Sequence, residues 1–395
     1  MPMGGWGILA GLWFATLTAF RRDPVWDLLL AGTMFLLAAA GFIRPGSVRA
    51  PRLALCIAAP AGLALAQLAF GQTISPSATA LDAVRWLGLA AWCVAVQREL
   101  SGTRGRFLEL AVHSAGAFAL LSLVMAWTSG TDRGQVWGPW VNPNHFAVWC
   151  ELMLPPAVWL AVKQRRFWWA AAALAAGGAA SGSRAGFALM ALELLLLLVL
   201  LGWQQVKWKL ALGLLALPLA AMLLRGDELW SKLRDSEPLL YRDQMWRSSI
   251  ELWRGAPWFG HGAGSFELAY PAAATFDTGE LVDHAHNDWL EWGVEGGLAL
   301  LIPLFAGYVY AARLVPSLPW LLGVPIAGLH ALVDYPWARF PMGLWVVLLI
   351  TLAALPYPRS RLKQQTVKKA TERRVPPKIG SGGPHGIPGR RVKLR

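Results

Sequence analysis

Charged residues are scarce in this sequence, where they make up 15% of the 395 residues, whereas hydrophobic residues make up 56%. A soluble domain of this size needs a far more charged surface, so the composition excludes one. The apolar residues form runs of about 17 to 22, each long enough to cross a hydrocarbon core about 30 Å thick. The sequence therefore predicts an all-α polytopic membrane protein.

Cysteine is also scarce, and the three cysteines, Cys56, Cys93 and Cys150, are scattered through apolar runs. This placement provides neither a disulfide framework nor the spacing of a zinc site. The first apolar run, about 4–20, lacks a basic start and is followed by residues 21–23, Arg-Arg-Asp, where a signal peptide would have a small-residue cleavage site. We therefore expect a retained membrane span there.

The net charge of +13 is unevenly placed. Residues 359–395 contain 12 Lys and Arg against the single acid Glu372, so this segment alone carries +11. It is also rich in Pro and Gly, which predicts a basic, disordered cytoplasmic tail at 358–395 after a transmembrane catalytic domain at 1–357. Such a tail lies most often against anionic lipid, so we expect membrane lipids, and no nucleic acid, as its partner.

Twelve membrane spans are predicted, with both termini on the cytoplasmic side. The spans are 4–20, 25–43, 53–72, 80–97, 107–127, 144–162, 167–184, 186–203, 208–224, 293–312, 319–337 and 341–357. With the N-terminus inside, the inner loops hold 12 Lys and Arg and the short outer loops hold three. Positive residues stay on the cytoplasmic side, which fixes this orientation.

One large outer loop, about 225–292, separates the ninth and tenth spans and contains 12 acids and six bases. It is the only predicted extramembrane segment large enough to build a site. Apolar and aromatic residues recur at helical spacing from Tyr241 to Trp253. We therefore expect amphipathic helices lying on the membrane surface in this loop.

Polar residues gather at the outer ends of the predicted spans and in this loop. They are Asn142, Asn144, His145, Ser183, Arg184, Arg242, Arg247, His284, His286, His330, Asp334 and Arg339. Structural roles are open for several of them: the two asparagines suit a helix N-cap, and Arg184 suits a snorkelling arginine. His330 and Asp334, four residues apart on one helix face, suit a satisfied pair, either within that helix or with a neighbouring helix. Their common location nevertheless predicts one functional site on the outer side.

Two loop motifs invite other interpretations. The glycines of 260–264 suggest a dinucleotide-binding turn, but no strand precedes them and no βαβ unit follows. His284 and His286 lie near carboxylates and suggest zinc, but the spacing is not HExxH and no cysteine is near. We therefore expect neither a metal nor another cofactor.

The order of these motifs resembles the O-antigen ligase and polymerase superfamily. The resemblance rests on Asn142–Phe146, on Gly182–Arg184, on Arg242 and Trp246 with the glycine run, and on His286, Asn287, Leu290, Glu295 and Gly297. It covers residues 20–355 and not the tail. His284 departs from the family pattern, which puts the identity of the acting histidine in doubt.

The resemblance implies a fold like that of C-type glycosyltransferases, in the bacterial inner membrane, with a periplasmic active site. It also implies a glycan donor linked to undecaprenyl diphosphate. In a ligase the glycan passes to the lipid A-core acceptor, and in a polymerase it passes to another repeat unit. The motifs alone do not separate these two reactions.

The residues suit that chemistry. Cleaving the sugar C1–O bond expels a diphosphate, which needs positive charge more than an acid, so we expect Arg184 and Arg242 to be catalytic. The acceptor hydroxyl needs a base, for which we assign His286, with His284 second. The expected substrate-binding residues are His284, Asn142, Asn144, His145, Arg247, Asn287, His330, Asp334 and Arg339. Because no DxD motif is present, we expect metal-independent transfer, with inversion at the anomeric carbon.

Ligase activity is favoured over polymerase activity because the outer loop is moderate in length and no second long loop is predicted. Protein O-glycosylation by a related ligase is an alternative within the same chemistry. A transporter for a lipid-linked glycan is an alternative of another class. A transporter would place polar residues at the bilayer midplane, whereas here they gather at one surface.

Overall fold

The computed structural model describes residues 3–21, 23–43, 48–128, 138–202, 212–213, 216, 241–275, 279 and 281–356. Within these ranges every regular element is a helix, which confirms the all-helical prediction. The α-helices are α1 (Met3–Leu17), α2 (Pro24–Ile43), α3 (Pro51–Ala69), α4 (Pro76–Leu100), α5 (Arg104–Thr128), α6 (Pro143–Lys163), α7 (Trp168–Ala180), α8 (Arg184–Leu201), α11 (Arg242–Gly255), α12 (Phe266–Ala269), α13 (Asp288–Leu314), α14 (Gly323–His330) and α15 (Phe340–Ala354). The 3₁₀ helices are η1 (Gly138–Trp140), η2 (Arg165–Phe167), η3 (Tyr270–Ala272), η4 (Pro319–Leu321) and η5 (Pro336–Ala338).

Among the described residues, seven helices are long and apolar enough to cross a membrane, namely α2, α3, α4, α5, α6, α8 and α13. Helices α1 and α15 are equally apolar but have 15 residues each, and α7 has 13. The chain is therefore a membrane protein with several spans. The expected span at 208–224, the first part of the large loop and the tail at 358–395 lie outside the described residues, so the count of twelve remains a prediction.

The expected span at 319–337 is wrong as a single helix. The chain there forms η4, the eight-residue α14, a turn and η5. Proline explains the interruptions: Pro319 and Pro336 each open a 3₁₀ helix, and a residue that precedes proline is disfavoured in the α conformation. Asp334 and Tyr335 therefore lie in an irregular turn.

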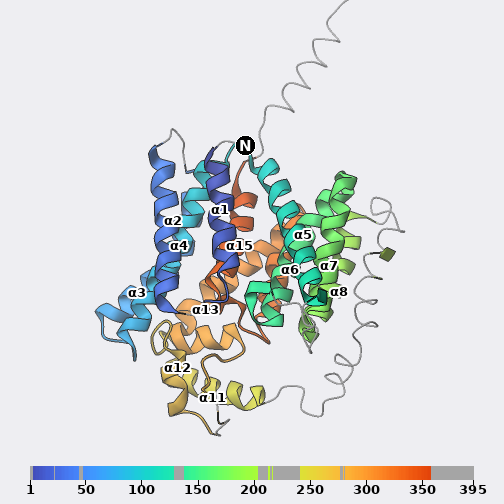
Figure 1. The fold of residues 1–395 in the computed structure, drawn as a ribbon. Coiled ribbons are helices and arrows are strands. Elements are labelled where there is room, and N and C mark those ends of the chain that lie inside the picture. The colour runs from blue at the N-terminus through green and yellow to red at the C-terminus, as the bar shows by residue number, and fades with distance from the viewer. Residues whose placement is uncertain are drawn as a thin grey trace, which may run out of the picture. The chain divides into compact units, whose positions relative to one another are not determined.

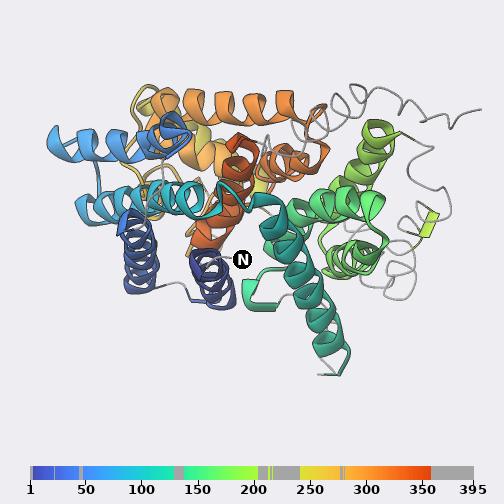
Figure 2. The same cartoon turned by 90° about the horizontal axis from the view of Figure 1, so that it is seen from above.

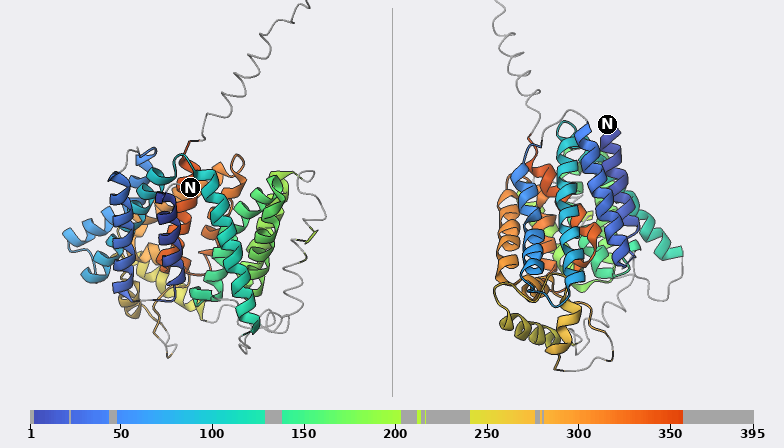
Figure 3. Two further views of the ribbon diagram at one scale, coloured as in Figure 1. Left: turned by 45° about the horizontal axis from the view of Figure 1, so that its top comes forward. Right: turned by 90° about the vertical axis from the view of Figure 1, so that its left-hand side faces the viewer.

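The loop helices α11 and α12 lie at the end of the bundle opposite to the N-terminus (Figures 1 and 3). The amphipathic helix expected at 241–253 is present as α11, which buries Ser248, Ser249 and Leu252 and packs against α13. Seen along the bundle, α15 lies between the group formed by α2, α3 and α4 and the group formed by α6, α7 and α8 (Figure 2).

Helix α13 breaks at Gly297, where φ is 58° and ψ is −156°. The break frees backbone groups on both sides, and the glycine-rich segment 257–264 bonds them. The His261 N–H donates to the Val294 carbonyl at 2.8 Å, and the Gly262 N–H donates to the Glu295 carbonyl at 3.0 Å. On the other side of the break, the Leu298 N–H donates to the Pro257 carbonyl at 2.9 Å.

The same segment is fastened to α3 by Gln67, a buried side chain. The Gln67 amide donates to the Phe259 carbonyl at 2.6 Å and to the Glu295 carbonyl at 2.8 Å, and it accepts from the Ala263 N–H at 3.0 Å. We call residues 257–264, bonded to Gln67 and to the α13 break, the glycine clasp. Because buried backbone groups must be paired, the clasp joins the loop to the bundle.

Gly260→Ala should destabilise the fold. Gly260 has φ of +68°, and an added Cβ would lie 2.3 Å from the Glu295 carbonyl carbon. The left-handed conformation alone costs a non-glycine residue about 1–3 kcal/mol, and the overlap adds to it. Thermal unfolding in detergent should show a lower Tm. Gly307→Ala in α13, where nothing lies within 4 Å, is the control. An unchanged Tm for Gly260→Ala would contradict the clasp.

Candidate functional site

Three predicted histidines surround the ring of Tyr335 in the turn between α14 and η5. The His284 ring stacks on Tyr335 at 4.5 Å between centroids, with an interplanar angle of 22°. The His286 and His145 rings meet the same ring edge-on, at 4.6 Å and 5.0 Å. His145 comes from the first turn of α6 and the other two from the loop before α13, so the structure brings separate motifs to one place.

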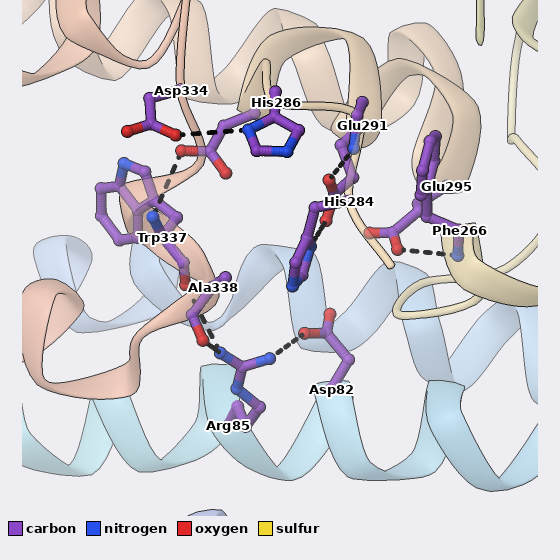
Figure 4. A network of polar contacts seen from close by, with 12 residues as sticks. Asp82, Arg85, Phe266, His284, His286, Glu291, Glu295, Asp334, Trp337 and Ala338 are labelled. Carbon is purple, nitrogen blue, oxygen red and sulfur yellow. Dashed lines mark hydrogen bonds and ion pairs between the residues drawn. The ribbon is translucent and has the colours of Figure 1, made fainter. Parts of the chain in front are cut away.

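In three histidines, a carboxylate lies beside the Nδ1 atom of the ring. His284 Nδ1 lies 2.8 Å from Glu291 Oε1, and His330 Nδ1 lies 3.0 Å from Glu151 Oε1. His286 Nδ1 lies 3.7 Å from Asp334 Oδ1, close enough for an ion pair but too long for a hydrogen bond (Figure 4). A carboxylate beside Nδ1 orients an imidazole and leaves Nε2 for a ligand.

The proposed pair of His330 and Asp334 on one helix face is wrong. Helix α14 ends at His330, and His330 pairs with Glu151 of α6. Asp334, in the turn that follows, faces His286 instead. The pairing of His330 across helices, which was one structural interpretation of this residue, makes it part of the packing of α14 against α6.

The backbone at His286 is in the left-handed region, with φ of 49°. Few non-glycine residues adopt this conformation, which costs about 1–3 kcal/mol and is held by the surrounding contacts. Two such contacts follow at once: Asn287 Oδ1 accepts from the Leu290 N–H at 3.1 Å and caps α13, and the Asp288 N–H donates to the Ala331 carbonyl at 2.9 Å. The cap and this backbone bond fix His286 against the turn that carries Asp334.

Arg242, the first residue of α11, reaches the same turn. Its guanidinium donates to the Val333 carbonyl at 2.7 Å, one residue before Asp334. From the same helix, the Trp246 indole N–H donates to the Ala285 carbonyl at 3.0 Å, between the two loop histidines. Helix α11 therefore connects the turn with the histidine segment, and Arg242 and His286 both contact the turn that carries Asp334. Arg247, on the same helix, is exposed.

Arg184 and the two asparagines lie where α8 and α6 begin. Asn142 caps α6, because its side chain accepts from the Asn144 N–H at 2.8 Å, which confirms the structural interpretation of Asn142. Ser183 caps α8 in the same way, through the Gly186 N–H at 3.0 Å. A Cβ on Gly186 would lie 2.5 Å from the Ala147 Cβ. The first turns of α6 and α8 are therefore in contact, and Arg184 lies at the end of the bundle that holds His145.

Several buried polar atoms near Tyr335 have no hydrogen-bond partner among the described residues. They include both ring nitrogens of His145, both carboxylate oxygens of Asp334 and Nε2 of His330. All three side chains are fully buried. Buried polar atoms are nearly always hydrogen-bonded in folded proteins. Such a concentration is typical of a site that binds a polar ligand.

A cavity of about 290 Å³ adjoins this centre, between α4, α13 and the turn that follows Tyr335. Of the predicted residues, His284 and Arg339 line it, and Arg339 is only 6% exposed. Arg184, Arg242 and His286 are not among its lining residues. Tyr335 itself also lines the cavity, so the centre and the cavity share Tyr335 and His284.

Asp82 and Arg85 of α4, which line this cavity, were not among the residues predicted for the site. Arg85 of α4 lies 3.4 Å from Asp27 and 3.9 Å from Asp82, and it donates to the Ala338 carbonyl at 3.2 Å (Figure 4). The sequence did contain a signal for these two residues, since Asp82 and Arg85 are ionisable residues inside a predicted membrane span. Ionisable residues at such depth mark functional sites more often than not.

The pKa of His284 is raised above its ordinary value. Burial alone would lower this pKa, but the Glu291 carboxylate, which is hydrogen-bonded to the ring, outweighs burial and favours the imidazolium. His284 lies in the loop before α13 and lines the cavity. At neutral pH its protonated fraction is therefore larger than that of an isolated histidine.

No group of three or more His, Cys, Asp or Glu side chains in the described part of the chain is arranged to hold a metal ion. The expectation of metal-independent chemistry stays untested by this observation.

Residues 169–305 match the family model described as O-antigen ligase. The match begins at α7 and includes α8, the glycine clasp, the two loop histidines and most of α13. The match supports the resemblance indicated by the motifs: this part of the chain is similar to the O-antigen ligase family, which implies glycosyltransferase-like activity in a membrane. A comparison with curated proteins found no match.

Glu291→Gln should lower the pKa of His284, because the change removes the carboxylate that favours the imidazolium. The His284 signal, assigned by its loss in His284→Gln and followed by NMR on protein labelled at histidine, should then titrate at lower pH than in the wild type. Glu251→Gln, at an exposed position of α11, should leave the titration in place. A His284 pKa that does not fall in Glu291→Gln would contradict this pairing.

Proposed function

We propose that this protein is an O-antigen ligase. In this proposal it transfers a glycan from undecaprenyl diphosphate to the lipid A-core oligosaccharide, on the periplasmic face of the bacterial inner membrane. One observation carries the proposal: the motifs from α6, α11 and the loop before α13 meet around Tyr335 and Asp334, and the α8 motif begins beside the start of α6.

Arginines provide the charge that the leaving group needs. Arg242 is held at the turn by the Val333 carbonyl, which uses one of its five N–H donors and leaves others for phosphate oxygens. Arg184 stands at the N-terminus of α8, where the helix dipole adds positive potential. In our proposal these two residues bind the diphosphate and stabilise the charge that develops as the C1–O bond breaks.

His286 acts as the base in this proposal. The acceptor hydroxyl gives up its proton to His286 as its oxygen attacks C1, and the Asp334 carboxylate, 3.7 Å from His286 Nδ1, stabilises the resulting imidazolium. The raised pKa of His284 favours its protonated form, which suits a role in binding more than the role of the base. Direct attack inverts the anomeric centre.

The choice of ligase over polymerase rests on the moderate length of the large loop. The acceptor distinguishes them in a cell: loss of a ligase leaves lipid-linked polymer intact and lipopolysaccharide without O-antigen. A polymerase defect instead leaves lipopolysaccharide capped with a single repeat.

His286→Gln should reduce transfer by about 10²–10⁴-fold, the usual contribution of a general base. Purified protein would be given a defined lipid-linked donor and lipid A-core in detergent, and the product would be measured by mass spectrometry. Arg242→Ala and Arg184→Ala should also abolish transfer while the protein inserts and folds normally. Arg254→Gln, at an exposed position of α11, is the matched control. Wild-type rates in any of the three variants would remove that residue from the site.

Transfer should continue in EDTA, because in this proposal arginines carry the charge that a divalent cation would otherwise neutralise. The same reconstituted reaction would be run with EDTA and again after addition of magnesium or manganese. Activity that is lost in EDTA and restored by either metal would refute the metal-independent mechanism.

A further inference from the structure

The cavity beside the Tyr335 centre has an aromatic wall. Trp86 of α4 stacks with Trp337 of η5 at 6.1 Å between centroids and an interplanar angle of 21°. Trp292 of α13 meets Trp337 edge-on at 5.8 Å. All three tryptophans line the cavity. Binding sites for small organic molecules combine such aromatic surface with a few placed polar groups.

Acidic side chains outnumber basic ones in the lining. Seven carboxyl groups line the cavity, among them Asp82, Glu267 and Glu291, against His284 and the three arginines Arg21, Arg85 and Arg339. This excess of acidic groups disfavours a diphosphate, and the two arginines that bind phosphate in the proposed function do not line the cavity. Carboxylates instead accept hydrogen bonds from hydroxyl or ammonium groups.

Arg85 is held in position at the centre of this lining. Its guanidinium lies between Asp27 and Asp82 and is bonded to the Ala338 carbonyl. Figure 4 shows Arg85 and Asp82 on α4 facing His284 and Glu291 of the opposite wall. Its carboxylate partners compensate its charge, which weakens its attraction for anions but leaves N–H groups that can donate to hydroxyl oxygens.

We propose that this cavity binds an uncharged or amino sugar ring of the glycan substrate, with Arg85, Asp82 and Glu291 as its hydrogen-bonding partners and the tryptophans against its apolar face. The inference rests on the proposed function insofar as the ring belongs to a substrate. A cavity of about 290 Å³ is at the lower limit of small-molecule sites, so it holds a single ring and not a whole repeat unit. Its acidic wall selects against uronic acids.

The first test is binding without transfer. Protein in nanodiscs would be mixed with methyl glucoside, methyl glucosaminide or methyl glucuronide and studied by saturation-transfer NMR. The first two should show saturation and the glucuronide much less. Arg85→Gln and Asp82→Asn should weaken binding about tenfold, as expected for a lost hydrogen bond to a charged group. Glu251→Gln, exposed on α11, should bind as the wild type does. Equal saturation in the wild type and Arg85→Gln, or stronger saturation of the glucuronide, would overturn the proposal.

Arg85→Gln and Asp82→Asn change partly buried residues and could fail to fold, so Glu267→Gln provides a second test. Glu267 lines the cavity but is exposed, so this substitution should not disturb folding. Removing its charge should raise the relative binding of the glucuronide by about threefold, as expected for a partly screened charge, and no change in selectivity would count against the acidic wall.

Competition identifies the source of the ring. The lipid-linked donor should displace the methyl glycoside if the ring comes from the donor, and lipid A-core should displace it if the ring comes from the acceptor. Undecaprenyl diphosphate alone should displace nothing. If neither glycan competes, the cavity is not a substrate subsite. If the glycosides bind and a glycan competes but wild-type protein never joins donor to acceptor, the proposed function fails and the sugar site stands.

Discussion

The break in α13 at Gly297 is the constraint on which the rest of this end of the molecule depends. A continuous helix would satisfy its own backbone and offer nothing to the loop. Because the helix breaks, the Val294 and Glu295 carbonyls accept bonds from the glycine clasp, and Gln67 joins the clasp to α3. The short N-terminal part of α13 then carries Glu291 against His284. Loop, helix and bundle meet through one set of buried hydrogen bonds.

Sequence patterns predicted the helices well because length and hydropathy carry most of that signal. Runs such as 25–43 and 144–162 correspond to α2 and α6 within two residues or fewer at each end. The run at 319–337 misled because its composition is apolar throughout, although the chain there forms η4, α14 and η5, with 3₁₀ helices opening at Pro319 and at Pro336. Hydropathy averages over such breaks.

The site was predictable in part. His145, His284, His286 and Asp334 were expected to converge, and they lie around Tyr335. Asp82 and Arg85 were missed because they lie inside a span, away from the motifs. The sequence also did not predict which carboxylate pairs with each histidine: His330 pairs with Glu151, 179 residues away, and not with Asp334. Spacing along one helix says nothing about a carboxylate supplied by another.

Tyr335 has a consequence for how this region responds to substitution. One phenol ring contacts three imidazoles, which come from α6 and from the segment before α13. Residues that share a contact have free-energy effects that do not add. A substitution of His145 can shift the Tyr335 ring, which His284 and His286 also contact. The effect of a single substitution therefore includes changes at the other two histidines. Apportioning the contribution of each imidazole requires double-mutant cycles through the shared aromatic ring.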